Sequence, residues 1–246
     1  MTAAFVIAVA LSIQQAPPPP PVEATPAWTD DRPLTRIFQN LQRDLTKFPR
    51  ITTIGIIGAG ALGAAASHRA DHDIADWVRD SGGERAYTPI GGLLGNAWLQ
   101  GGAAIAAYSI GVVQDSPELA HIGSDLIRAQ MLNGVFTVGL KVAAGRTRPD
   151  GGRHSFPSGH VSATFASATV LADHYGWKVG LPAYAFAGFI GWTRVRNNQH
   201  YLSDVVFGSA IGIAAGKTVT LGHKARRFSV VPVAVPGGGG VFVIRN

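Results

Sequence analysis

Residues 156–175, FPSGHVSATFASATVLADHY, join a proline turn to a run of small and apolar residues with no Asp, Glu, Lys or Arg before Asp173. Similar, mostly uncharged runs recur along the chain, and none shows the sustained alternation of a half-buried strand. They cover residues 51–67, 86–114, 122–144, 179–193 and 202–221. The breaks between them contain Gly, Pro, Asp or Asn, which are typical where helices end. The sequence therefore predicts an all-α fold, a bundle of six apolar helices.

The composition describes a folded and unusually apolar chain. Of 246 residues, 46% are hydrophobic and 15% charged, which excludes a disordered protein. The 31 glycines favour closely packed helices, and the absence of cysteine excludes disulfides and thiolate metal sites. The net charge of +6 indicates an acidic partner: nucleic acid, an anionic membrane surface or a phosphorylated substrate.

The chain divides into four parts by composition. Residues 1–16 form an apolar leader that is too short to span a bilayer and suits a signal peptide. Residues 17–50 are a Pro-rich linker followed by an amphipathic segment, and residues 51–222 hold the helical core. Residues 223–246 form a basic and then Gly-rich tail with two short extended runs, to which we assign no chemistry.

A glycine pattern in the first core segment imitates a nucleotide-binding fingerprint. Gly58, Gly60 and Gly63 have the G-x-G-x-x-G spacing. The fingerprint also needs a second strand that ends in an acidic residue about twenty positions on, but that region is not strand-like. Small residues at Gly55, Ala59 and Gly63 instead favour close helix packing.

A polar cluster follows at His68, Asp71, His72, Asp73 and Asp76. The two histidines are four residues apart and would share a helix face, as metal ligands often do. Because no recognisable motif supplies a third ligand, we interpret the cluster as a polar segment between helices and expect no metal there.

Three segments carry the chemistry: residues 141–149, 156–160 and 193–204. Each joins the end of a predicted helix to a break. If the helices alternate in direction with short connections, all three segments lie at one end of the bundle.

Together these segments would form a cationic pocket. Lys141, Arg148 and Arg194 can donate to several oxygens of an anion. Ser158 and Gly159 begin a helix whose free N–H groups can bind an oxyanion. The residues therefore predict a phosphate site.

Histidines supply the reactive groups. His200 and Asp204 are four residues apart, so the carboxylate can orient the imidazole and leave its other nitrogen as a nucleophile. His160, in the first turn of the preceding motif's helix, can protonate the leaving oxygen. No metal is needed, because the cations already neutralise the developing charge.

The spacings K-x6-R-P, P-S-G-H and R-x5-H-x3-D resemble the three-part signature of the type 2 phosphatidic acid phosphatase superfamily, which includes bacterial acid phosphatases and vanadium haloperoxidases. The motifs cover residues 141–204. The resemblance implies a helical bundle with phosphate-binding and catalytic groups at its motif positions. These are Lys141, Arg148, Ser158, Gly159 and Arg194 for phosphate, His200 as the phosphorylated nucleophile, His160 as the acid and Asp204 as the support of His200.

Two details lie outside the signature. The third motif commonly opens with Ser-Arg, whereas here it opens with Thr193 and Arg194, which keeps a hydroxyl. Arg146, His154 and Arg196 fall between motif positions, and we interpret them as solvated loop residues that could still touch a leaving group.

The expected function is metal-independent hydrolysis of a phosphate monoester or diphosphate, of a lipid such as phosphatidate or a polyprenyl diphosphate. No cofactor is expected, with vanadate as an inhibitor. One alternative is a vanadium haloperoxidase, in which vanadate is the cofactor and His200 its ligand. Another is a protein that binds a phospholipid or other anion without turnover.

The partner is expected to be a phosphorylated lipid or small phosphate ester, with membrane association. Nucleic acid is not expected, because the cations lie in the motifs and at residues 224–227 without interleaved aromatic residues. Asp125, Arg128 and Lys141 interrupt one apolar segment, which leaves open whether the bundle spans the membrane. We expect a site that faces the periplasm of a bacterial cell envelope.

Overall fold

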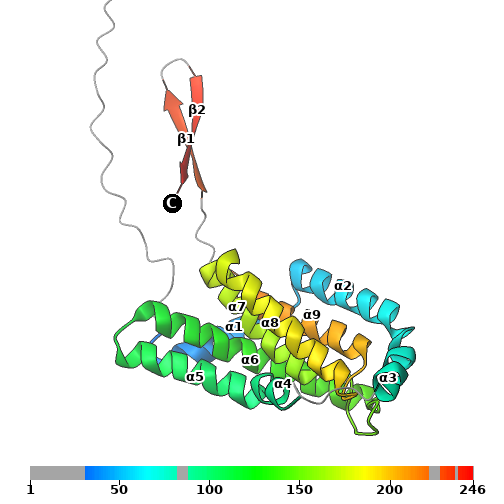
Figure 1. Ribbon diagram of the computed structural model, residues 1–246. Helices are drawn as coiled ribbons and strands as arrows, with labels where there is room; N and C mark the ends of the chain where they lie inside the picture. Colours follow the sequence, from blue (N-terminus) through cyan, green and yellow to red (C-terminus); the bar gives the residue numbers. More distant parts are fainter. Residues whose placement is uncertain (1–30, 82–87, 222–227, 236–237, 246) are drawn as a thin grey trace, which may run out of the picture.

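The computed structural model describes residues 31–81, 88–221, 228–235 and 238–245, and the predicted leader, most of the linker and the basic start of the tail lie outside them. Within these residues the fold is all-α apart from one terminal hairpin (Figure 1). The helices are α1 (Leu34–Lys47), α2 (Ile51–His68), α3 (Asp71–Asp80), α4 (Thr88–Leu94), α5 (Ala97–Val113), α6 (Pro117–Ala144), α7 (Gly159–Tyr175), α8 (Trp177–Arg196) and α9 (Leu202–Thr220).

The described residues thus contain nine helices, and the predicted count of six is wrong. Each of the six apolar segments is helical, but the segment at residues 86–114 forms two helices, α4 and α5. The break falls at Asn96, whose side chain accepts a hydrogen bond of 2.8 Å from the Trp98 amide and caps α5. The other two additional helices, α1 and α3, are polar on one face and lie outside the apolar segments.

Glycines allow the long helices to approach closely. A Cβ on Gly212 of α9 would lie 2.3 Å from the Ser162 carbonyl oxygen of α7, and one on Gly123 of α6 would lie 2.3 Å from the Tyr108 amide nitrogen of α5. The fingerprint-like segment is helix α2, which packs beside α9 (Figure 1). Two of its glycines face α9: a Cβ would lie 2.2 Å from that of Ala210 on Gly60 and 3.1 Å from Val206 Cγ1 on Gly63. These glycines serve helix packing, but Gly55 and Ala59, which were predicted to share the packing face, are exposed.

The core consists largely of small side chains between α6, α7 and α9. Ala129, Ala166, Val170 and Val219 form one buried cluster. Leu132 of α6 is also almost fully buried. Because small side chains fill little volume, the helix axes must lie close together, which keeps the loops at the bundle end near one another.

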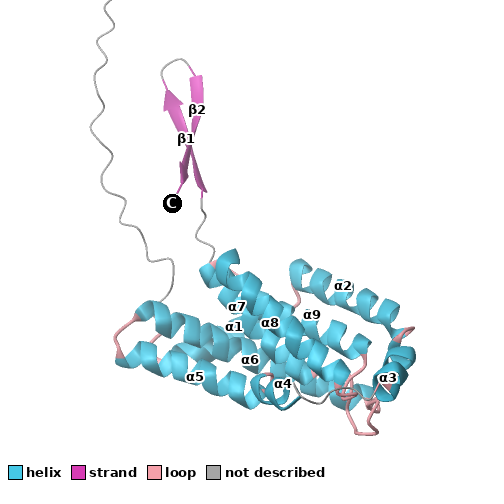
Figure 2. Ribbon diagram, viewed as in Figure 1, coloured by secondary structure: helices cyan, strands magenta, loops and turns pink. Residues whose placement is uncertain are grey.

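Loops at one end of the bundle join α6 to α7 and α8 to α9, near α3 (Figure 2). The amide of Ser158, before α7, donates a hydrogen bond of 3.0 Å to the Asp204 carbonyl oxygen in the first turn of α9. Residues 46 positions apart are thereby fixed together, as the alternating helix directions predict.

Strands β1 (Phe228–Val235) and β2 (Gly238–Arg245) pair antiparallel after the last helix, with Phe228 opposite Arg245 and Val235 opposite Gly238. In the described chain, α2 and α9 are long and apolar enough to cross a membrane. Only 17% of the α2 stretch is buried within the protein, against 61% of the α9 stretch. The apolar surface of α2 is therefore mostly uncovered.

Candidate active site

The first motif, residues 141–149, spans the end of helix α6 and the start of the loop that follows it. Gly145 has φ of +56°, a left-handed conformation that suits glycine and closes the helix C-terminus. In the last turn of α6, Lys141 Nζ donates to the His154 carbonyl oxygen at 2.7 Å. His154 Nδ1 donates in return to the Lys141 carbonyl oxygen at 3.0 Å. His154 is exposed in the loop, as predicted, and these two hydrogen bonds tie the loop to α6.

Three motif cations repel one another in the site. Burial and the charge of Arg148 lower the pKa of Lys141 to about 8. The same two causes lower the pKa of Arg194, which is 2% exposed and donates to Gln199 Oε1 at 2.6 Å. A bound anion would relieve this repulsion, so the geometry favours a ligand with several negative charges.

The side chains of His200 and Asp204 lie next to each other, although only Asp204 belongs to a helix. His200 lies in the turn before α9, whereas Asp204 lies in the first turn of that helix. Their closest atoms, His200 Nδ1 and Asp204 Oδ2, are 3.5 Å apart, and Nδ1 makes no hydrogen bond to any described residue. Both side chains are buried, at 3% and 0% exposure. Burial lowers the pKa of His200, and this outweighs the opposing effect of Asp204.

The carboxylate of Asp204 is held by other donors. Its Oδ2 atom accepts from the Ser155 hydroxyl and, at 2.9 Å, from the Tyr201 amide. Its Oδ1 atom accepts from Arg146 at 2.7 Å. The carboxylate therefore has a fixed position from which it can orient the imidazole of His200.

Ser158 and Gly159 start α7 beneath Lys141. A Cβ on Gly159 would lie 3.5 Å from Lys141 Cε, so the helix start and this cation are neighbours. The Ser158 amide is already used by the Asp204 carbonyl oxygen, while its buried hydroxyl finds no hydrogen-bond partner in the described chain. The amides that follow Ser158 are those that an anion can reach, because the first N–H groups of a helix have no partner within it.

His160 points toward α4, and its surroundings disfavour its protonated form. Its Nε2 atom donates to the Gly92 carbonyl oxygen at 3.2 Å. Burial, together with the charges of Arg194 and His200, lowers the pKa of His160 to about 4. Because a general acid must carry a proton, His160 can act as one only when a bound anion raises its pKa again.

Arg146 is a half-buried bridge between buried carboxylates, and its interpretation as a solvated loop residue is wrong. Besides Asp204, it donates to Asp71 Oδ2 at 2.8 Å and to the Ser203 hydroxyl at 2.8 Å. Its guanidinium also stacks over the Tyr201 ring, 4.1 Å from the centroid. Arg146 thus joins the first motif to α9 and to α3, although no motif spacing marks it.

Arg196 also has partners. Its guanidinium donates to the Ser81 hydroxyl at 3.4 Å and lies 5.3 Å from the centroid of the Trp77 ring. It therefore contacts α3 and its C-terminal end, and is not a solvated loop residue.

Two residues of the predicted polar cluster, His68 at the end of α2 and Asp71 at the start of α3, join this hydrogen-bond network. Asp71 is 1% exposed and accepts from the Ser203 amide at 3.0 Å and from His68 Nδ1 at 2.9 Å. Burial raises its pKa, but the hydrogen bonds from Arg146, Ser203 and His68 outweigh burial and lower the pKa below its usual value. Arg146 thus supplies the positive charge opposite Asp71.

A partly open cavity of about 470 Å³ lies next to Arg146 and Ser203. Its wall is mostly apolar and comes from α2, α9 and the loop before α7. Phe156 and Phe207 stack in this wall with their ring centroids 4.9 Å apart. An apolar group can therefore lie beside the polar network.

Comparison with known proteins identifies the motif-bearing segment. The sequence profile of the PAP2 superfamily matches residues 150–228. A lipid A 1-phosphatase of Porphyromonas gingivalis is 39% identical over 98 residues, which cover 38% of this chain and 22% of that protein. A lipid A 4'-phosphatase of Helicobacter pylori is 32% identical over 106 residues, covering 38% and 54%. The chain thus spans about half the length of these relatives or less.

A solved structure, the PAP2-type phosphatidylglycerolphosphate phosphatase of Bacillus subtilis, aligns with 79% of this chain and 98% of its own at 18% identity and a TM-score of 0.37. The PSGH and R-x5-H-x3-D motifs fall inside the segment that the superfamily profile matches. Over residues 150–228 the superfamily profile thus supports the resemblance that the motif spacings indicate.

Proposed function

We propose that this chain is a metal-independent lipid phosphatase that works through a phosphohistidine at His200. The observation that carries the proposal is the burial of His200 against Asp204 beside three motif cations. With Nδ1 turned toward the carboxylate, Nε2 lies on the other side of the ring, where it can reach a phosphorus atom held by the cations.

The reaction then has two halves. His200 Nε2 forms a bond to phosphorus while the bond from phosphorus to the leaving oxygen breaks, and His160 gives its proton to that oxygen. Water next attacks the phosphohistidine, His160 takes a proton from this water, and the phosphorus–nitrogen bond breaks. Lys141, Arg148 and Arg194 stabilise the charge on the phosphoryl oxygens in both halves. No resident cofactor is required, and vanadate should inhibit.

Two observations support a lipid as the substrate. The relatives are named for phosphatase activity on lipid A. Apolar side chains also cover the outside of α2, α5 and α8, where five of them are at least 75% exposed: Ile51, Leu62, Trp98, Val113 and Trp177. Such a surface favours contact with lipid over water. We place the protein on a membrane of a bacterial cell envelope, with the site facing the periplasm.

The test measures phosphate release in detergent with EDTA, from phosphatidate, a polyprenyl diphosphate, lipid A and a soluble aryl phosphate. Wild type is compared with His200→Ala and with His72→Ala, which removes an exposed histidine outside the proposed catalytic group. We expect EDTA-resistant turnover in wild type and His72→Ala, and a loss of at least a thousandfold in His200→Ala, as for other catalytic nucleophiles.

Circular dichroism in the same buffer confirms that each variant is folded. Turnover of the aryl phosphate alone would remove the lipid from the proposal. Retention of activity by folded His200→Ala would refute the phosphohistidine.

A further inference from the structure

A second cluster of ionisable side chains lies far along the bundle from the motif residues. His121 and Asp125 are in the early turns of α6, whereas Lys141 is near its C-terminus. His174 is in the last turn of α7, whose first turn holds His160. We infer that His121, Asp125 and His174 bind one divalent transition-metal ion, for which Zn²⁺ is the best match.

The geometry of the three side chains suits such an ion. Their nearest ligand atoms all lie within 4.8 Å of one another. Asp125 Oδ2 is 2.8 Å from His174 Nε2 and 3.8 Å from His121 Nε2. In a tetrahedral Zn²⁺ site with bonds of about 2.0–2.1 Å, neighbouring ligand atoms are about 3.3 Å apart. The two distances bracket this value, so small side-chain rotations would bring the ligands into place.

A buried carboxylate orients the first histidine, and a buried guanidinium holds the aspartate. Asp31 Oδ2 lies 2.7 Å from His121 Nδ1, so this nitrogen donates its proton and Nε2 keeps a lone pair directed at Asp125. This is the carboxylate–histidine arrangement found behind metal ligands. Arg128 donates to Asp125 Oδ1, which leaves Oδ2 facing the histidines. The set therefore has the outer contacts of a metal site as well as its ligands.

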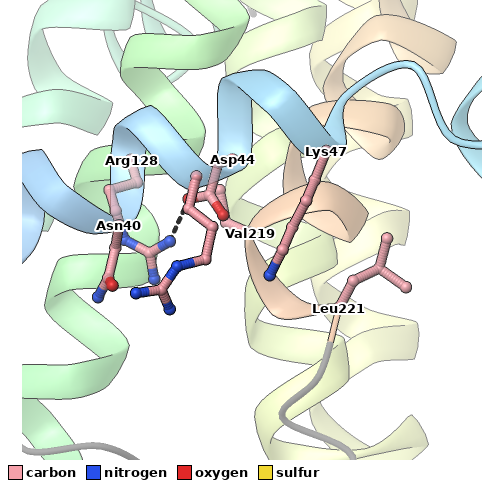
Figure 3. Close-up of a pocket in the computed structure, with 7 residues that line it drawn as sticks. Asn40, Asp44, Lys47, Arg128, Val219 and Leu221 are labelled. Carbon is pink, nitrogen blue, oxygen red and sulfur yellow. Dashed lines mark hydrogen bonds and ion pairs between the residues drawn. The ribbon is translucent and has the colours of Figure 1, made fainter.

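Charge supplies an independent argument. Arg128 also pairs with Asp44 of α1 (Figure 3), so one guanidinium joins two carboxylates. Asp31, Asp44 and Asp125 contribute three negative charges and Arg128 one positive charge, and all four side chains are at most 5% exposed. Among these four described side chains the carboxylates outnumber the guanidinium, an arrangement that favours a nearby cation.

Two further cations, Arg43 and Lys47, line a cavity beside Asp44, where Figure 3 labels Lys47. The charge of Lys47 acts on Asp44, whereas Arg43 is exposed, so water screens it. Burial raises the pKa of Asp44, outweighing its contact with Arg128. Protonation of both histidines would also place positive charge beside the carboxylates, so the experiment must separate that state from a metal ion.

The proposed ion would join three parts of the chain that are distant in sequence. It would tie α6 to the C-terminal end of α7, while Asp31 behind His121 would attach the segment before α1. Its role is to stabilise the bundle, because no cluster residue belongs to the motifs. The ion takes no part in the phosphatase reaction.

The test uses the full chain in detergent, freed of metal with a chelator and then titrated with Zn²⁺ alone or Co²⁺ alone. We expect one ion per chain, a Co²⁺ absorption spectrum typical of nitrogen and oxygen ligands, and a higher melting temperature with Zn²⁺. His174→Ala should weaken Zn²⁺ binding at least a hundredfold, and Asp31→Asn about 10- to 100-fold. The control His72→Ala should bind like wild type.

Failure of wild type to bind one ion per chain would overturn the proposal, and so would equal binding by wild type and folded His174→Ala. Protonated imidazoles without metal in the nuclear magnetic resonance spectrum at neutral pH would support the alternative. His200→Ala separates this proposal from the phosphatase, because it should lose turnover and still bind one ion.

Discussion

Replacing Arg146 with Met tests whether the bridge between two buried carboxylates holds the site together. The change keeps most of the side-chain volume and removes the charge that faces Asp71 and Asp204, which are 1% and 0% exposed. Breaking a buried ion pair costs about 3–5 kcal/mol. Because the Arg146 side chain is 21% exposed and water can replace part of it, we take the lower end, about 3 kcal/mol.

For a protein of this size a loss of 1 kcal/mol lowers the melting temperature by about 2–4 °C, so Arg146→Met should lower it by about 6–12 °C. Thermal unfolding followed by circular dichroism measures the shift. Arg153→Met, an exposed arginine in the same loop, is the matched control and should change the melting temperature by less than about 2 °C. Adding Asp71→Asn to Arg146→Met removes one orphaned charge and should restore part of the loss.

Activity gives a second measure of the same bridge. Without Arg146 the carboxylate of Asp204 loses one of its donors, so kcat should fall more than KM rises, because the orientation of His200 is disturbed more than phosphate binding. If Arg146→Met melts within about 2 °C of Arg153→Met and keeps wild-type kcat, the bridge has no structural role and the reasoning fails.

Two further changes test the electrostatics and the packing of the site. The pKa of Lys141 is lowered to about 8 by burial and Arg148, so raising the pH through this value neutralises the ammonium and should lower kcat/KM. In Lys141→Arg the charge persists and the alkaline fall should move to higher pH; an unchanged profile would exclude Lys141 as its source. Gly208→Ala would place a Cβ 2.8 Å from the Ser158 carbonyl oxygen, so it should destabilise the protein by about 1–3 kcal/mol and lower activity. The control Gly134→Ala, with no atom within 4 Å of the added Cβ, should be neutral or stabilising in urea unfolding, and equal behaviour of both variants would refute the packing argument.

Much of the fold follows from local composition. The six mostly uncharged segments have at least 15 residues each and show no strand-like alternation, which favours helices, and each of them is largely helical here. The predicted number of helices was wrong where only one or a few residues mark a helix boundary or a buried face. Asn96 is a single cap that splits one apolar run, and α3 begins inside a polar stretch whose buried face consists of Asp71, Ala75 and Val78. The sequence does not reveal that these residues are buried, because their burial depends on other helices that pack against α3.

The site was predictable to the extent that its parts lie in short motifs at helix ends. Alternating helix directions bring those ends together, as the contact between Ser158 and Asp204 illustrates. Arg146 could not be found in this way, because its partner Asp71 is 75 positions away and belongs to no motif. Many sequences have an arginine beside a motif and an aspartate elsewhere in the chain. This combination alone therefore cannot predict that the two residues form an ion pair.

The cations that attract a phosphate group also determine the state of the proposed acid. In the ligand-free site, burial and the charges of Arg194 and His200 lower the pKa of His160 to about 4, so this imidazole is neutral near pH 7. A bound phosphate dianion introduces negative charge among the same groups, and an opposite charge nearby favours the protonated imidazole. The pKa of His160 must therefore rise when substrate binds. In the proposed mechanism the substrate thus brings with it the negative charge that protonates its own general acid.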